Sequence, residues 1–278
     1  MSPLLFVAVR LVAAAALLAL VMVAWRQSWT PLRGRWHHLA LSGILVNGVT
    51  LSAFHAGMVT EKAAVMALVQ ALSPLLIALV AVPLLGERLS RRQWLGLALG
   101  AAGVVLVVAP PALESAGAWG AVRLGFLGVA SLAGGTIYFS RFGRDVPLLA
   151  ATTVQLGGAA VLTVALTLVF ERPYSVWTFP AVASVAWNVL AVSIGAMALY
   201  YYMLNHGTAG RVAANFYLIP GTVALLGWAL LGERLTPGAL VGFAVASVGV
   251  FLVARRRPVE HAAGSGPRAP VSAGARPS

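Results

Sequence analysis

Residues 84–90 read LLGERLS and residues 230–236 read LLGERLT, so the two motifs stand at an offset of 146 residues. A proline lies ten residues before each motif and two glycines follow it, all at the same offset. A long internal repeat indicates that one architectural unit occurs twice in the chain. The paired landmarks outside the motifs are Pro74 and Pro220, Gly96 and Gly242, and Gly103 and Gly249.

Each motif predicts the end of one helix, a tight turn and the start of the next helix. Gly86 and Gly232 suit the left-handed residue that closes many helices, because glycine has no Cβ that would clash there. Ser90 and Gln93 have the spacing of a capping box, in which two side chains satisfy free N–H groups at a helix start. The motif is therefore interpreted as a helix–turn–helix at the membrane surface.

The glutamate of each motif has two interpretations. Glu87 and Glu233 are candidate catalytic or coupling acids, but both lie at the turn. Pairing with a neighbouring arginine or with a helix end is the favoured role. We therefore group both glutamates with the two motif glycines and the two prolines as structural or hinge positions.

The composition indicates a membrane protein. Of the 278 residues, 60% are hydrophobic and 9% are charged, whereas a soluble domain carries about 25% charged residues. The charges lie between apolar runs of roughly 20 residues, the length that a helix needs to cross a bilayer. Nine runs are predicted as transmembrane helices: 3–25, 38–58, 63–85, 94–110, 122–140, 147–170, 182–204, 212–231 and 237–254. The fold class is thus an all-α polytopic membrane protein, and the first run is interpreted as a helix and not as a cleaved signal peptide.

The number of helices between the motifs decides the relation of the two repeats. Five predicted helices separate them, so the first motif lies on one side of the membrane and the second on the other. Two repeats in opposite orientations are typical of secondary transporters, whose binding site lies near the bilayer midplane where the halves meet. The sequence therefore predicts an inverted-repeat carrier, with a small-molecule substrate.

The basic residues predict the orientation. On one side, the loops and the tail hold 14 Lys or Arg residues, against 4 on the other side. Loops rich in Lys and Arg remain in the cytoplasm, so the C-terminus is predicted inside and the N-terminus outside. The net charge of +12 is then a topology signal and argues against a nucleic-acid partner.

The tail at 258–278 is predicted to be disordered and cytoplasmic. The absence of cysteine from the sequence excludes disulfides.

At the two LLGERL motifs, with their flanking proline and glycines, the sequence resembles the EamA-type transporters of the drug/metabolite transporter (DMT) superfamily. The stretch SPLLFVAVRLVAAA at 2–15 is also similar to the family's second helix, including its arginine. The resemblance implies two EamA repeats, at 2–110 and 122–256, in a bacterial inner membrane. It also implies export of metabolites, amino acids or drugs, without a cofactor, and leaves a homodimer open.

The family usually has ten helices and both termini in the cytoplasm. This sequence begins where the family's second helix would be, so we expect four helices in the first repeat and five in the second. An outside N-terminus is the orientation that the loss of one leading helix predicts.

Ionisable groups inside the predicted helices are few. All seven acids fall in loops, at helix ends or in the tail, whereas proton- and sodium-coupled carriers usually keep such a group in the membrane. A carboxylate relay is therefore not expected. Arg10 is the strong charge within a span, and it has two balanced interpretations: it binds a substrate carboxylate, or it snorkels outward and bonds helix-end carbonyls.

Five neutral polar residues complete the candidate substrate site. Asn47 lies in the middle of its run, Gln70 lies one turn before the first repeated proline, and Asn215 and Tyr217 precede the second. Gln155 is a weaker candidate. A proline in a helix bends the backbone and frees a carbonyl, so these positions are predicted to line a bent segment that faces the cavity, although an interhelical hydrogen bond is an equally good explanation for any one of them.

Three other classes of protein compete with a carrier. An enzyme would need a nucleophile, an acidic pair or a metal constellation, and no such motif occurs in the sequence. A channel would need a pore-lining ring, which the sequence does not offer. A non-transporting membrane scaffold is left open, and saturable flux distinguishes a carrier from a channel.

Overall fold

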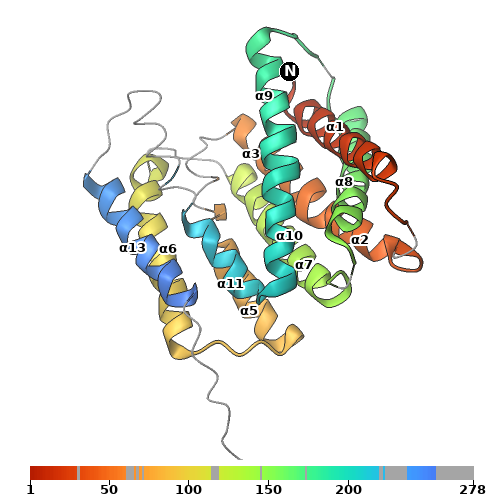
Figure 1. Cartoon of the computed structure of the whole chain (residues 1–278). Coiled ribbons are helices and arrows are strands. Elements are labelled where there is room, and N and C mark those ends of the chain that lie inside the picture. Colours follow the sequence, from red (N-terminus) through yellow and green to blue (C-terminus); the bar gives the residue numbers. More distant parts are fainter. Residues whose placement is uncertain are drawn as a thin grey trace, which may run out of the picture.

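The computed structural model describes residues 1–29, 32–60, 66, 69–70, 72–113, 119–144, 146–172, 174–218, 222 and 237–254. Within these residues every regular element is a helix, as Figure 1 shows. The repeated positions Pro220, Gly232 and Glu233, and the tail at 258–278, lie outside the described residues. The predicted all-α fold class is confirmed.

The part of the chain up to residue 113 forms a first group of helices. A single long helix is divided by its hydrogen bonding into α2, the π-helical segment η2, and α3. The elements are α1 (Pro3–Ala24), α2 (Trp36–Gly43), η2 (Ile44–Val49), α3 (Thr50–Thr60), α5 (Ser73–Leu85) and α6 (Arg91–Leu113).

The part from residue 119 onward forms a second group in a similar order. Here too a long helix holds a central π-helical segment, η3. The elements are α7 (Trp119–Phe142), α8 (Leu148–Phe170), α9 (Phe179–Trp187), η3 (Asn188–Ala196), α10 (Met197–His206), α11 (Ala209–Ala214), the 3₁₀ turn η4 (Asn215–Leu218) and α13 (Pro237–Ala254).

The lengths of these helices agree with membrane crossing. Among the described residues, five helices are long and apolar enough to span a bilayer, and two more are apolar but shorter. The five are Pro3–Ala24, Trp36–Val59, Val122–Phe142, Leu148–Phe170 and Phe179–His206, and the shorter two are Ser73–Leu85 and Leu240–Val253. Six of them coincide with predicted runs, apart from a few residues at their ends, whereas Ser73–Leu85 matches only the second half of the predicted run 63–85.

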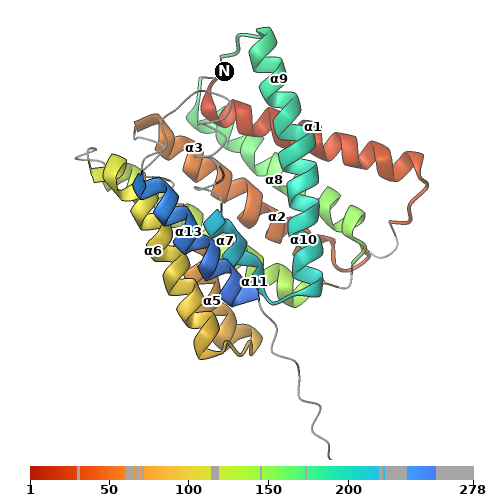
Figure 2. The same cartoon turned by 60° about the vertical axis from the view of Figure 1, so that its left-hand side comes forward.

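Helices α6 and α13 pack along their glycines, side by side in both Figure 1 and Figure 2. A Cβ atom on Gly96 would meet the backbone oxygen of Gly249 at 2.6 Å, and one on Gly103 would meet that of Gly242 at 2.6 Å. The earlier glycine of one helix thus faces the later glycine of the other, so the two helices run antiparallel. This is the arrangement that inverted repeats require of equivalent helices, and it uses the close approach that small residues permit in membranes.

Helices α1 and α8 form a second closely packed pair. Val7 and Leu11 of α1 are fully buried against Leu156 and Ala159 of α8. These two helices hold equivalent places in the repeat, because PLLFVAVRL at 3–11 parallels PLLAATTVQL at 147–156, which has one more residue. In both cases a helix of the first repeat therefore packs against its equivalent in the second repeat: α6 against α13, and α1 against α8.

The first repeated motif forms the turn that its residues predict. Gly86 closes α5 in the left-handed conformation, with φ of 65°. The backbone N–H of Ser90 donates to Oε1 of Gln93 at 2.9 Å, and the N–H of Gln93 donates to Oγ of Ser90 at 3.3 Å. The capping box at the start of α6 is confirmed.

Pro74 differs from the sequence interpretation. It does not bend the middle of a helix but lies in the first turn of α5, which begins at Ser73. At this position a proline costs no intrahelical hydrogen bond, because the first N–H groups of a helix have no partner within it. The Oγ of Ser73 donates to the carbonyl of Gln70 at 2.6 Å and so joins α5 to the residues before it.

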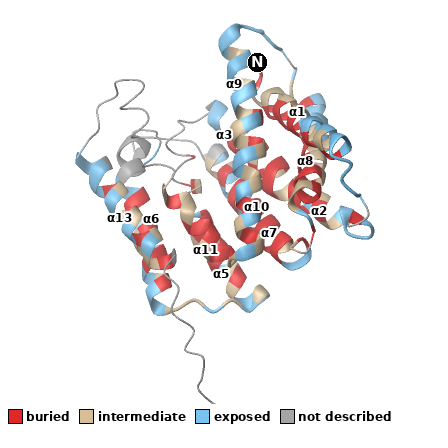
Figure 3. Cartoon of the chain, viewed as in Figure 1, coloured by how far each residue is buried: buried red, intermediate tan, exposed pale blue. Residues whose placement is uncertain are grey.

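Burial differs between the two helices that contain π-helical segments. Within the most apolar window of Trp36–Val59, 56% of the residues are buried, against 17% for Phe179–His206. Figure 3 shows the exposed surface of α9 and α10 beside the buried helices behind it. The first helix is enclosed by α7 and α8, whereas its counterpart presents an apolar face at the surface.

Glycine packing between α6 and α13 gives a first prediction. Changing Gly103→Ala places a Cβ 2.5 Å from the backbone nitrogen of Ala246, so the helices must separate. We expect a loss of about 1–3 kcal/mol in the free energy of unfolding, measured by thermal unfolding in detergent. Gly157→Ala is the matched control, because its Cβ meets no atom within 4 Å. Equal stability of the two variants would contradict the packing.

Candidate substrate-binding site

The two π-helical segments occupy equivalent places in the repeat. Adding the offset of 146 residues to η2 gives 190–195, which lies within η3 at 188–196. Short π-helical stretches are rare and occur frequently at functional sites. We therefore build the candidate site outward from η2 and η3.

Arg10 of α1 reaches η3. Its Nε donates to Oγ of Ser193 at 2.7 Å, and its Nη1 donates to Oδ1 of Asn188 at 3.1 Å. The arginine is 4% exposed, and Ser193 is completely buried. The side chain therefore points into the protein and does not snorkel outward. Among the described residues no acid pairs with it, so neutral oxygens partly replace the hydration of the guanidinium.

Gln155 of α8 makes the equivalent contact in the other repeat. Its Nε2 donates to Oγ of Ser42 at 3.2 Å. Gln155 corresponds to Arg10 in the parallel stretches of α1 and α8, and Ser42 corresponds to Asn188 at the offset of 146 residues. The same hydrogen bond thus occurs twice, once with a cation and once with a neutral amide. Oε1 of Gln155 is buried and has no partner among the described residues.

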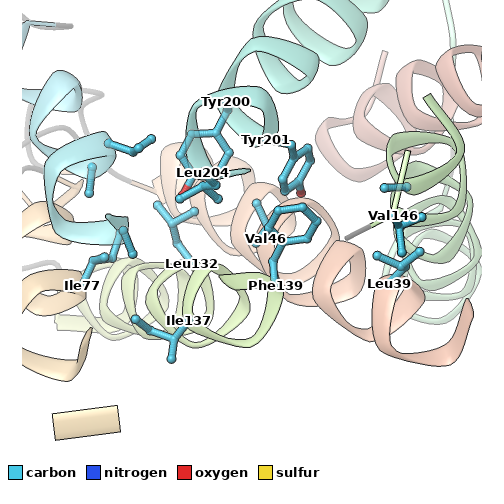
Figure 4. Packing of buried hydrophobic residues seen from close by; sticks show 14 of the residues in the cluster. Leu39, Val46, Ile77, Leu132, Ile137, Phe139, Val146, Tyr200, Tyr201 and Leu204 are labelled. Atoms are coloured by element: carbon cyan, nitrogen blue, oxygen red, sulfur yellow. The ribbon is translucent and has the colours of Figure 1, made fainter. Parts of the chain in front are cut away.

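Asn47 lies in η2 and is completely buried. Its Nδ2 donates to the hydroxyl oxygen of Tyr201 at 3.2 Å, whereas its Oδ1 is buried without a partner in the described part of the chain. Figure 4 shows the Tyr201 ring beside Phe139 and Val46, and the two aromatic rings lie 4.7 Å apart. Asn47 is the repeat equivalent of Ser193, so both π-helical segments place a polar side chain at the same position.

Two of the three successive tyrosines of α10 are buried inside the protein. Tyr201 is completely buried and Tyr200 is 7% exposed, and only Tyr202 of the three lies mainly at the surface. The hydroxyl groups of Tyr200 and Thr136 are 2.7 Å apart. Three successive tyrosines near a helix end suggest a membrane interface, and only the packing of α10 against α7 and η2 shows which of them face inward.

Side-chain hydroxyls stabilise η2. The carbonyl oxygen of Leu45 accepts hydrogen bonds from Thr50 Oγ1 and from Ser131 Oγ, both at 2.8 Å. A π-helical turn shifts the regular pattern of backbone bonds, and within a membrane every carbonyl must still find a donor. Hydroxyl groups from α3 and α7 therefore hold the irregular turn in place.

Three of the predicted site residues lie elsewhere. Tyr217 of η4 is 1% exposed and its ring packs on Gly100 of α6, and its hydroxyl has no partner among the described residues. Asn215 donates to the carbonyl of Val212 in its own chain segment at 3.0 Å. Gln70 is half-buried and precedes α5. The structure thus places Arg10, Asn47 and Gln155 in or against the two helices that contain the π-helical segments, but not these three.

The two described acids bind helix N-termini. The Glu87 carboxylate accepts from the backbone N–H groups of Ala209 at 2.7 Å and Gly210 at 3.4 Å, at the start of α11. The Glu171 carboxylate accepts from the N–H groups of Leu4 at 2.9 Å and Leu5 at 3.1 Å, in the first turn of α1. Negative charge is favourable at a helix N-terminus, where N–H groups lack partners. Within the described residues no three His, Asp or Glu side chains gather as metal ligands.

The fold and these contacts define the class of protein. It is an all-α membrane protein in which equivalent transmembrane helices surround buried polar side chains. The chain belongs to the EamA-like transporter family, whose sequence model matches residues 1–109 and 119–255. It is therefore a membrane transporter.

Two curated proteins and one solved structure are similar to the chain. The uncharacterized inner membrane transporter YedA of Escherichia coli strain K12 is 29% identical over 255 residues, which are 90% of this chain and 81% of that protein. The uncharacterized transporter YoaV of Bacillus subtilis is 26% identical over 94 residues, 34% of this chain and 32% of its own. A crystal structure described only as that of a protein has a TM-score of 0.76 at 22% identity, covering 91% of this chain and 88% of its own, and supports the fold.

The contact between Glu87 and α11 gives a second prediction. Changing Glu87→Ala removes both hydrogen bonds at the start of α11, so we expect a loss of about 1–2 kcal/mol in the free energy of unfolding. Thermal unfolding of the purified protein measures this change. Arg88→Ala is the control, because Arg88 is the adjacent residue and is exposed. Equal effects of both substitutions would show that the carboxylate does not stabilise this helix start.

Proposed function

We propose that this protein is a secondary transporter that exports small amphipathic molecules, such as amino acids, related metabolites or drugs, by alternating access. The substrate binds between η2 and η3, and its anionic group meets Arg10. The main support is the hydrogen bond that occurs at equivalent positions in both repeats, from Arg10 to Asn188 and from Gln155 to Ser42. A repeat that preserves buried polar contacts fits a binding site at the junction of two inverted halves.

Arg10 supplies the substrate's anionic group with donors. Its Nε and Nη1 donate to the neutral oxygens of Ser193 and Asn188. A carboxylate accepts two parallel bonds from a guanidinium in a geometry that neutral oxygens do not match. We therefore expect a substrate carboxylate to replace one of the neutral partners.

Other buried polar atoms supply acceptors. Oδ1 of Asn47 and Oε1 of Gln155 have no partner in the described part of the chain, and each accepts a hydrogen bond from a donor such as a substrate ammonium. For Gln70, Asn215 and Tyr217 a contact with substrate stays a prediction. Energy coupling through a carboxylate in the membrane is not part of the proposal, because Glu87 and Glu171 are bound to helix ends.

The proposed direction of transport depends on the orientation of the chain in the bacterial inner membrane. Contacts join the loops that carry many arginines: Arg144 donates to the carbonyl of Gly207 at 3.0 Å, and Arg141 donates to that of Leu84 at 3.3 Å. These loops thus lie at one end of the molecule, and we assign that end to the cytoplasm.

Single-cysteine labelling tests this orientation, because the native sequence contains no cysteine. Gln27 and Ser175 are exposed and lie at opposite ends of the described helices. We expect Ser175→Cys to react with a membrane-impermeant thiol reagent in intact cells. Gln27→Cys should react only after the membrane is permeabilised. The reverse labelling pattern would overturn the assigned orientation.

A ligand screen tests the substrate site. Thermal unfolding of the purified protein is measured with amino acids, their metabolites and amphipathic drugs, since a ligand at 100 times its Kd stabilises the native state by about 2.7 kcal/mol. We expect a selective stabilisation that Arg10→Met abolishes and Arg10→Lys weakens. Thr163→Val is the matched control: Thr163 is buried on α8, and its side-chain hydroxyl donates to the carbonyl of Ala160 in the same helix.

Flux in proteoliposomes then separates the classes of membrane protein. Saturable uptake of the stabilising compound, lost in Arg10→Met and kept in Thr163→Val, is the result expected of a carrier. Flux that does not saturate would indicate a channel. A folded protein that no compound stabilises and that moves none of them would indicate a scaffold and would overturn the proposed function.

A further inference from the structure

A basic pocket lies at the arginine-rich end of the molecule, apart from the candidate substrate site. It has a volume of about 310 Å³ and lies between the start of α2 and the end of α7. Its lining residues are Gly34, Arg35, His38, Arg141 and Phe142. Two arginines and a histidine thus surround one small space between two membrane-spanning helices.

Side-chain contacts form the wall of this pocket. His38 stacks on Phe142 with 4.8 Å between ring centroids, and its Nδ1 lies 2.6 Å from the hydroxyl of Tyr138. The guanidinium carbon of Arg141 lies 5.8 Å from the centroid of the Phe142 ring, and Nη1 donates to the carbonyl of Leu84. His38 and Arg141 are therefore held in place by neighbouring aromatic side chains and a backbone carbonyl before any ligand arrives.

The electrostatics of the pocket favour an anion. Helix α2 begins at Trp36 with no acidic residue in its first turn, so the partial positive charge of the helix N-terminus adds to that of the arginines. The lining contains no acidic side chain, and Glu87 and Glu171 bind the starts of α11 and α1.

The surroundings indicate that the anion belongs to a lipid. Trp36, Leu41 and Phe142 are apolar side chains that are 61%, 41% and 38% exposed on the helices beside the pocket. Tryptophan at a helix start marks the depth of the headgroups, and basic pockets between transmembrane helices bind anionic headgroups. A lipid phosphate at the arginines would leave its acyl chains along the exposed faces of α2 and α7.

We infer that the pocket between α2 and α7 binds the phosphate of an anionic phospholipid from the leaflet on the arginine-rich side. The ligand is recognised by charge and by depth in the membrane. The inference does not depend on the proposed substrate or direction of transport, since none of the lining residues belongs to the candidate substrate site.

Lipid titration of the purified full chain tests the inference. Binding of phosphatidylglycerol and of phosphatidylcholine is measured by native mass spectrometry and by the shift in unfolding temperature. We expect phosphatidylglycerol to bind selectively, and each of Arg35→Gln and Arg141→Gln to weaken its binding about fivefold. Raised salt should weaken binding as well, because the contact is partly exposed. Arg141→Lys keeps the charge and should retain most of the affinity.

The control variants are Arg91→Gln and Arg92→Gln, which remove exposed arginines at the start of α6, outside the pocket. They should leave the binding of phosphatidylglycerol unchanged. An equal loss in the control and pocket variants would show a diffuse surface effect and would overturn the pocket. If inorganic phosphate alone produced the full shift in unfolding temperature, the inference of a bound lipid would be wrong and the pocket would be a site for a free anion.

Discussion

The hydrocarbon of a bilayer offers no hydrogen bonds, so each backbone carbonyl within it must be satisfied by the protein itself. The π-helical segments η2 and η3 depart from regular α-helical bonding in the middle of two long helices. In η2 the carbonyl of Leu45 is held by two hydroxyl groups, from Thr50 and Ser131. These bonds stabilise the irregular turn. The turn in its place positions the Asn47 side chain to donate a hydrogen bond to Tyr201. The candidate site therefore depends on a few side-chain hydroxyl groups that supply the hydrogen bonds the bilayer cannot offer.

The internal repeat gives two similar halves, and the candidate site combines residues in which the halves differ. Arg10 and Gln155 hold equivalent places on α1 and α8, and each bonds to the helix that contains a π-helical segment. One is a cation and the other a neutral amide, so the charge of these two equivalent contacts is asymmetric. The two long helices also differ in burial, because the one that contains η3 presents an apolar face at the surface. One cation among otherwise equivalent contacts of the two repeats suits the proposed carrier, which would bind the charged end of an amphipathic molecule.

The two described acidic residues have structural roles. Glu87 and Glu171 each bind two backbone N–H groups at the start of a helix distant in sequence. Basic residues gather instead at one end of the molecule, where Arg35 and Arg141 line a pocket. Among the described residues, acids thus bind helix starts, while Arg10 is buried among the helices.

The sequence by itself determined the class of protein, the positions of most helices, the turn at Gly86 and the capping box at Ser90. These features depend on hydrophobicity and on residues a few positions apart, which local chemistry controls. It also singled out Arg10, Asn47 and Gln155. Only the tertiary structure decided that Arg10 meets Ser193, that Tyr201 faces inward, and that Pro74 begins a helix in place of bending one. The contacts of Arg10 and Tyr201 join residues more than a hundred positions apart, and they depend on helix rotation and close approach, which the order of residues along one helix does not specify.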